Sequence, residues 1–248
     1  MFNTQHILYM VISSILTIGL LVVFALFVKE KNTKNLILKI FAILTVILHY
    51  SDLFYGFFAN GGEETISSTH ILPMYPCNVV MWLLLAASLI KNKDSVIFRV
   101  IAEFCFYGGI VCGIVGILLN ANFDSTPTLA DYYVLKGLLS HSTMLFGCIY
   151  MLVGGFIKIR VFNALSIAIG LASFVVCGLL VNGLYSIFNM ESPDGMFLRS
   201  NPYFPVSPII LGVVAVIVLF GVLALTELRL PKEERWYTLL KKRFNKNK

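Results

Sequence analysis

Seven apolar runs, separated by short polar stretches, dominate the pattern of this chain. They cover roughly residues 7–28, 36–59, 71–90, 97–119, 133–155, 162–187 and 207–227. Each run is long enough, or nearly so, to cross about 30 Å of hydrocarbon as a helix. A segment inside lipid has to be helical, because its backbone groups find no water to bond. The pattern therefore predicts an all-α fold, a polytopic membrane bundle of seven transmembrane helices.

The composition agrees with a chain embedded in lipid. Of the 248 residues 58% are hydrophobic and 13% are charged, whereas soluble domains carry about a quarter charged residues. The connecting stretches are short and leave no room for a soluble domain. We therefore expect a single transmembrane domain over residues 1–228 and a basic juxtamembrane tail over 229–248.

The placement of charge predicts an orientation. Of the 19 Lys and Arg residues, 17 lie around the first, third and fifth loops and in the tail, and only Lys136 and Arg199 fall elsewhere. The opposite side carries Glu63, Glu64, Asp124, Asp131, Glu191 and Asp194. Since basic loops stay in the cytoplasm, the N-terminus is expected outside and the C-terminus inside. The tail interleaves its basic residues with Trp236, Tyr237 and Phe244, which favours binding to anionic inner-leaflet lipid over nucleic acid.

Polar side chains inside a membrane are costly, so they are the first candidates for a functional site. Here they gather at one depth in the outer half of the expected bundle. They are His49 and Asp52 in the second helix, Cys77 in the third, Ser140 and His141 in the fifth, and Asn182 and Tyr185 in the sixth. This arrangement suggests one polar site, although independent scatter of polar residues would produce the same pattern.

The third apolar run is expected to become helical late. Pro73 and Pro76 do not suit a helix interior, but proline suits a first helical position, so this helix is expected to run from Pro76 to about Ile90. Met74 and Tyr75 would then be non-helical, and Cys77 would lie in the first turn. A cysteine at a helix start beside a histidine is typical of an activated nucleophile.

Two histidines can partner Cys77. His141 is the better candidate for a base, and its alternative is a packing histidine bonded to a backbone carbonyl. His49 is the second candidate, with Asp52 placed to orient it, and its alternative is a structural pair with Asp52. His6 and His70 fall in terminal and loop segments, where solvated or interfacial histidines are normal.

The other four cysteines, Cys105, Cys112, Cys148 and Cys177, lie in apolar surroundings and are expected to be small buried hydrophobes. There is no CxxC pair and no His/Cys cluster with metal spacing, so we expect neither a metal site nor a cofactor.

Several short motifs resemble one family. Leu-Pro-Met-Tyr-Pro-Cys-Asn at 72–78, Ser140–His141, Asn182 with Tyr185, Met-Phe-Leu at 196–198 and Asn201–Pro202 follow one another in its order. By these motifs the chain is similar to the YwaF-type (TP0381-like) bacterial integral membrane proteins, sometimes called transport permeases. The resemblance covers residues from about 36 to 220 and implies a bacterial plasma membrane protein. One departure is Tyr75, where the family usually has His, so no metal or acid–base role is expected there.

The arrangement is also similar to a eukaryotic transmembrane family that transfers acyl chains between phospholipids through a Cys and a His. That similarity implies Cys77 as acyl acceptor and His141 as its base. The supporting or substrate-binding residues would be His49, Asp52, Tyr75, Asn78, Ser140, Asn182 and Tyr185.

Three functions remain open from the sequence. The first is acyl transfer or ester hydrolysis on an outer-leaflet lipid, with Asn182 or Tyr185 donating hydrogen bonds to the developing oxyanion. The second is a transporter or permease component, which the absence of a repeat and the off-centre polar groups make weaker. The third is a sensor that binds lipid without reacting.

Overall fold

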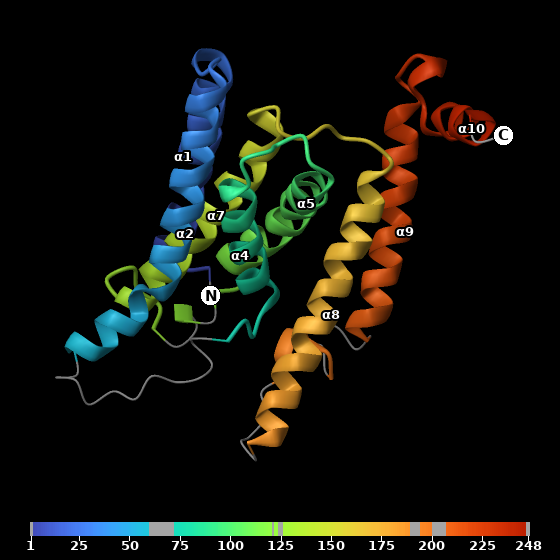
Figure 1. Cartoon of the computed structure of the whole chain (residues 1–248). Helices are drawn as coiled ribbons and strands as arrows, with labels where there is room; N and C mark the ends of the chain where they lie inside the picture. The colour runs from blue at the N-terminus through green and yellow to red at the C-terminus, as the bar shows by residue number, and fades with distance from the viewer. Residues whose placement is uncertain are drawn as a thin grey trace. The chain divides into compact units, whose positions relative to one another are not determined.

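The computed structural model describes residues 2–59, 72–120, 122–123, 126–188, 194–199 and 207–246, and only the backbone at 208 and 242–246 (Figure 1). Its elements are α1 (Thr4–Phe27), α2 (Lys31–Ala59), α4 (Pro76–Leu89), α5 (Val96–Leu118), α7 (Tyr132–Val153), α8 (Asn163–Ile187), η1 (Gly195–Phe197), α9 (Pro208–Glu227), η2 (Lys232–Glu234) and α10 (Trp236–Lys246). Each of the seven predicted apolar runs overlaps one of these α-helices, although α1 and α2 begin three and five residues before their runs. The prediction of an all-helical membrane protein is confirmed for the described residues, which contain no strand.

Five helices are long and apolar enough to cross a membrane among the described segments: α1, α2, α5, α8 and α9. α4 has only 14 residues. α7 has 22 residues, but the polar side chains from Ser140 to Thr143 lower its mean hydropathy. Large apolar side chains are widely exposed on the outer faces, for example Ile15 (65%) and Ile217 (65%). Soluble proteins rarely expose apolar surface on this scale, so these faces are suited to lipid.

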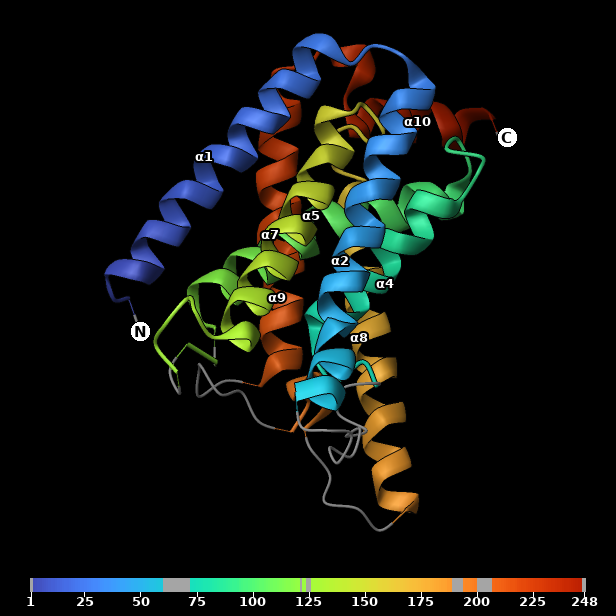
Figure 2. The same ribbon diagram turned by 90° about the vertical axis from the view of Figure 1, so that its left-hand side faces the viewer.

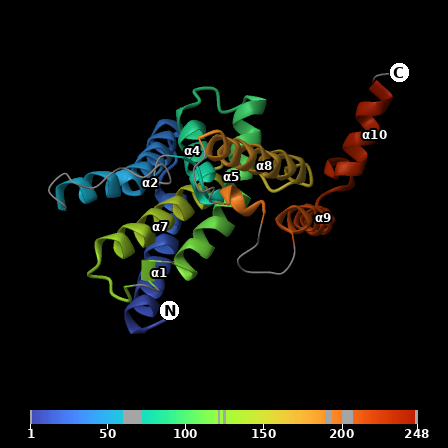
Figure 3. The same cartoon turned by 90° about the horizontal axis from the view of Figure 1, so that it is seen from below.

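The chain divides into two compact units, residues Met1–Ile157 and Lys158–Lys248. In the first unit, α7 contacts α1, α2, α4 and α5, and α4 also contacts α2 and α5. Figure 3 shows α7 with α2 and α5 on different sides, and Figure 2 shows α1 and α2 joined at one end and diverging from there. α7 is therefore the helix around which this unit packs.

The contact between α5 and α7 depends on glycine. A side chain at Gly109 would overlap Cys148, and one at Gly113 would lie 2.8 Å from the Leu145 side chain. Small residues at such spacing let two helices approach closely in lipid, where no hydrophobic force drives them together. Beside this contact lies a small apolar core, formed by Ile117, Phe123, Val134 and Leu138.

His6 is not solvated, contrary to the expectation from its place near the terminus. Its side chain is fully buried. The ring nitrogen Nε2 lies 2.7 Å from the Ile117 carbonyl oxygen, and the ring stacks on Phe123 with centroids 4.6 Å apart. The start of α1 is thus attached to the end of α5, and this contact could not be deduced from hydropathy.

In the second unit α8 contacts α9 and η1. The buried Glu227 carboxylate at the end of α9 accepts hydrogen bonds from the backbone N–H of Val161 (2.7 Å) and of Trp236 (2.8 Å). A buried carboxylate needs such partners to offset its desolvation. Glu227 therefore joins the segment before α8 to the start of α10.

Candidate active site

The start of α4 follows the predicted geometry. Tyr75 precedes the helix in an extended conformation (φ −117°, ψ 154°), and Pro76 is its first residue. The Asn78 side-chain oxygen accepts a hydrogen bond from the Tyr75 N–H at 3.2 Å, which satisfies a backbone donor that the helix itself leaves open. The late helix start is confirmed, and it places Cys77 in the first turn.

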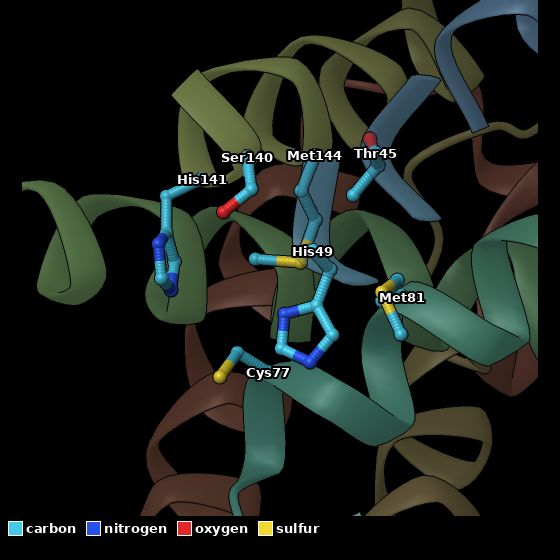
Figure 4. Close-up of a pocket in the computed structure, with 7 residues that line it drawn as sticks. All are labelled: Thr45, His49, Cys77, Met81, Ser140, His141 and Met144. Carbon is cyan, nitrogen blue, oxygen red and sulfur yellow. The ribbon is translucent and has the colours of Figure 1, made fainter. Parts of the chain in front are cut away.

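Cys77 lines a pocket together with both candidate histidines. The pocket is formed by Thr45 and His49 of α2, Cys77 and Met81 of α4, and Ser140, His141 and Met144 of α7 (Figure 4). Its empty space, including the open mouth, is ≈ 210 Å³. Because this figure counts space outside the mouth, the enclosed part is far smaller than the about 300–1,000 Å³ of a pocket that holds a whole small ligand.

Asn78 connects Cys77 to His49. Its Nδ2 lies 2.8 Å from His49 Nε2, and its Oδ1 lies 3.7 Å from the Cys77 sulfur, which donates a weak hydrogen bond. Only 3% of Asn78 is exposed. A buried amide with its partners in place is a rigid element, so Asn78 fixes the relative position of the cysteine and His49.

His141 is held by its own helix and by α5. Its Nδ1 lies 2.8 Å from the Gly137 carbonyl oxygen, and the Ser140 hydroxyl donates to the same oxygen at 2.9 Å. On the other side the ring packs on Gly116, where any side chain would overlap it. The carbonyl bond expected of a packing histidine is therefore present, and the ring nevertheless lines the pocket. Cys77 and His141 share this space without a direct hydrogen bond between them among the described contacts.

Asp52 forms an ion pair that the sequence did not suggest. Its carboxylate lies 2.7 Å from the Lys136 ammonium group of α7, and the two side chains are 13% and 11% exposed. One turn away, the Tyr132 hydroxyl donates to Ser51 Oγ at 2.6 Å. In the sequence, Lys136 stands out only as one of the two basic residues that do not lie on the basic side of the membrane. A lysine inside an apolar run, at the depth of an aspartate on another helix, was the signal that could have identified the pair.

Three further predicted residues are not among those that line the pocket. Tyr75 is 51% exposed, and its backbone N–H donates to Asn78. Asn182 and Tyr185 belong to the second unit and are buried, at 7% and 4% exposure. The Asn182 side-chain oxygen accepts a hydrogen bond from the Gly195 N–H at 2.9 Å, which attaches η1 to α8. The catalytic and supporting roles of these residues stay predictions.

Some predicted features fall outside the described residues. They are His70, the acidic residues Glu63, Glu64, Asp124 and Glu191, and the Asn201–Pro202 motif. Thr45, Met81 and Met144 were not predicted as site residues. Thr45 donates to the Phe41 carbonyl oxygen (2.8 Å) and contacts the Thr143 hydroxyl at 3.1 Å, so it joins α2 to α7 beside the pocket.

The remaining cysteines lie outside the pocket lining. All five cysteines are free thiols; Cys105 and Cys148 are buried, whereas Cys112 and Cys177 are partly exposed. Within the described ranges, no three His, Cys, Asp or Glu side chains are close enough to hold a metal ion. The pocket therefore offers a thiol, two imidazoles and hydroxyl groups as its reactive set.

The model of the TMEM164 family matches residues 1–227, most of the chain and all of the residues that line the pocket. No curated protein matches, and no solved structure matches. Together with its apolar helices, this match identifies a multi-pass membrane protein. The chain belongs to the TMEM164 family.

Proposed function

We propose that this protein is a lipid-modifying enzyme that transfers an acyl group, or hydrolyses an ester, through a Cys77 thioester. The observation that carries the proposal is the pocket in which Cys77 lies with His141 and His49, contributed by three helices. A nucleophile with an imidazole beside it is the arrangement that covalent acyl transfer requires. The resemblance to membrane acyltransferases that use a Cys and a His points to the same residues.

The proposed reaction has two halves. First, the Cys77 thiol gives its proton to His141, and the sulfur attacks the ester carbonyl carbon. The tetrahedral intermediate then breaks its carbon–oxygen bond, and the leaving alcohol takes the proton from His141. In the second half an alcohol, an amine or water loses a proton to His141 and attacks the thioester. The carbon–sulfur bond breaks, and the thiol regains its proton.

The lack of a direct bond between Cys77 and His141 is compatible with this sequence. Catalytic hydrogen bonds are often long or absent before substrate binds. Both residues line the same open pocket, so a substrate ester that enters it would lie beside the thiol and the imidazole.

We also propose the full topology that the charge pattern suggested. Seven helices, α1, α2, α4, α5, α7, α8 and α9, would cross the membrane, with the N-terminus outside and the C-terminus in the cytoplasm. α4 falls short in length and α7 in hydropathy, but both pack against longer helices of the first unit. The Cys77 pocket would then open toward the outer leaflet of a bacterial plasma membrane.

The tail would bind the inner surface of that membrane. α10 places Trp236 and Leu240 one turn apart on one face and carries Lys241, Lys242 and Arg243. A basic segment with aromatic residues at its start is suited to anionic headgroups, and vesicle binding that weakens with salt would support this role.

Lipid profiling tests the enzymatic proposal. The parent protein and its Cys77→Ala, His141→Ala and Cys112→Ala variants are expressed in the same host, and the membrane lipids are compared by mass spectrometry. The parent and the Cys112 control should change the acyl composition, and the Cys77 and His141 variants should not. Equal lipids in all four strains would refute the proposal. A lipid that copurifies intact with an unreactive Cys77 would indicate a sensor, and solute uptake that survives loss of Cys77 would indicate a transporter.

A further inference from the structure

Two polar contacts between α2 and α7 show that these helices run antiparallel in one register. Thr45 Oγ1 lies 3.1 Å from Thr143 Oγ1. About two helical turns later on α2, and equally far back on α7, the Asp52 carboxylate lies 2.7 Å from the Lys136 ammonium group. The hydroxyl contact is at the pocket, because Thr45 lines it, and the ion pair lies further toward the start of α7.

The ion pair lies about one helical turn from the pocket. Asp52 follows His49 by three residues on α2, and Lys136 precedes Ser140 by four residues on α7. At the helical rise this offset is about 5 Å along both helices. His49 and Ser140 line the pocket together with Cys77. In the topology proposed above, the start of α7 is at the outer surface, so the ion pair lies on the headgroup side of the pocket.

The two members of the pair differ in how far their hydrogen-bonding groups are used. Asp52 Oδ1 accepts the Leu53 N–H at 3.0 Å, and Oδ2 accepts from Lys136. An ammonium group has three N–H donors. Within the part of the chain that the structure describes, Asp52 is the one hydrogen-bond partner of Lys136, although only 11% of the lysine side chain is exposed. The donors that remain point to an acceptor, and a buried cation favours a negatively charged one.

The stability of the bundle does not by itself account for this pair. A well-packed apolar pair of similar volume holds two helices at least as firmly, because it has no charge to desolvate. An ionisable group inside a membrane therefore indicates a functional site by default. Lys136 is also one of the two basic residues that lie away from the basic side of the membrane, where a cytoplasmic role would place them.

We propose that Lys136 is a specificity-determining residue: its ammonium group binds the phosphate of a glycerophospholipid whose ester enters the Cys77 pocket. This inference rests on the acyl-transfer function proposed above and names the headgroup chemistry of its substrate. In such a lipid the phosphate is attached to the glycerol carbon next to one that carries an ester. The two groups are separated by roughly one helical turn, which matches the offset between Lys136 and the pocket. Asp52 holds the ammonium group in this position.

Two lipids that differ only in the phosphate test the assignment. Dioctanoyl phosphatidic acid carries the phosphate, whereas dioctanoylglycerol has a neutral hydroxyl group in its place, which forms a weaker hydrogen bond with a cation. Acylation of Cys77 by each lipid is measured on the full chain in dodecyl maltoside micelles, which contain neither phosphate nor ester. The octanoylated Cys77 peptide is quantified by mass spectrometry, and thermal unfolding shows whether each variant is folded.

The ratio of the two acylation rates is the readout, because a general loss of folded protein cancels from it. The parent should react roughly 10- to 100-fold faster with phosphatidic acid, as expected for a hydrogen bond between charged groups. The neutral double variant Asp52→Asn with Lys136→Met should lose this preference. Lys136→Arg keeps the charge and should retain most of the preference. Lys93→Gln removes a lysine that is not part of the pocket or the ion pair, and it should keep the parent ratio.

Native mass spectrometry of the Cys77→Ala protein gives a second readout that does not depend on acyl transfer. This protein should retain phosphatidic acid in preference to dioctanoylglycerol, and the preference should disappear when Asp52→Asn and Lys136→Met are added. An equimolar amount of inorganic phosphate should not displace the lipid. If it does, the site takes free phosphate and the assignment to a headgroup is wrong.

Two further outcomes separate this inference from the function on which it rests. If the double variant keeps the parent preference, or slows with both lipids equally, Lys136 does not bind the phosphate and the ion pair only joins α2 to α7. If phosphatidic acid is retained through Lys136 but neither lipid acylates Cys77, the phosphate site stands and the acyl-transfer function fails.

Discussion

The two helices that flank α7 contact it by different chemistry. Toward α2 the contacts include two polar pairs, the Lys136–Asp52 ion pair and the Thr45–Thr143 hydroxyl contact, beside aromatic stacking such as that of Phe41 on Phe146. Toward α5 the contacts depend on the absence of side chains at Gly109, Gly113 and Gly116. Polar pairs fix how far one helix is shifted along its neighbour, because a shift would leave charges unmatched. Glycines instead allow the two helix axes to approach closely.

His141 belongs to both sides of this comparison. Its ring rests on Gly116 of α5, and it lines a pocket that α2 and α4 complete. The position of the His141 ring thus depends on its steric fit against Gly116 of α5. The position of α7, which carries this ring, depends on polar contacts with α2. The two kinds of contact should therefore respond differently to substitution.

The largest effect on stability is expected from removing the ion pair between α2 and α7. Asp52→Asn leaves the Lys136 ammonium group without its counter-ion at 11% exposure, which should lower the free energy of unfolding by up to about 3 kcal/mol. Reversible unfolding in mixed micelles, followed by circular dichroism, measures this change.

The matched control removes both charges. The double variant Asp52→Asn with Lys136→Met should recover most of the lost stability, because a neutral pair has no buried charge to solvate. A single Asp52→Asn variant as stable as the parent would mean that the ion pair does not hold α2 against α7.

A smaller effect on stability, but a selective one on the site, is expected from the glycine side. Gly116→Ala places a methyl group within the His141 ring, and such overpacking typically costs about 1–3 kcal/mol. Because the ring has to move, alkylation of Cys77 should also slow, by about tenfold. Gly19→Ala is the control, since nothing lies within 4 Å of its added methyl group; it should stabilise by roughly 0.5–1 kcal/mol. Equal effects at the two glycines would contradict steric placement of His141.

The smallest effect concerns a lysine without a carboxylate partner. Lys93, in the turn after α4, donates to the carbonyl oxygens of Ala87 (2.6 Å) and Ser88 (3.1 Å). Burial, followed by the nearby charge of Lys39, lowers the pKa of Lys93 from 10.5 to about 8. Between about pH 8 and 10.5 the unfolded chain therefore binds the proton that the folded chain has released, so stability rises with pH across this range.

The measurement for Lys93 is the unfolding temperature of the parent minus that of Lys93→Gln, followed from pH 7 to 10. The difference should move in favour of the parent as the pH rises. A flat difference would mean that Lys93 has the same pKa in the folded and the unfolded chain.

Much of the fold followed from hydropathy, because lipid requires long apolar helices. The late start of α4 also followed, since Pro76 suits a first helical turn and little else in a helix. The prediction that His141 and Cys77 share a site rested on helical rise and orientation, and the pocket contains both residues. Depth along a membrane helix can be counted from the sequence.

The rotation of each helix about its axis, and so the faces by which helices meet, could not be predicted from the sequence. The sequence places Asp52 beside His49, but Asp52 pairs with Lys136 on another helix, and His49 contacts Asn78. These pairs depend on which faces of α2, α4 and α7 meet. The contact between Gly116 and His141 could not be predicted either. Which side chain fills the space beside a glycine is determined only when the helices pack.

The shortness of α4 has a consequence for the membrane itself. Its 14 residues span about 21 Å at the helical rise, against a hydrocarbon thickness of about 30 Å. If α4 crosses the membrane, as proposed above, its short span creates hydrophobic mismatch, which the bilayer relieves by thinning locally. Ester groups that normally lie at the interface would then descend toward the first turn of α4 without leaving their leaflet. Bilayer thickness, set by acyl-chain length, would thereby control how readily lipids present themselves to this protein.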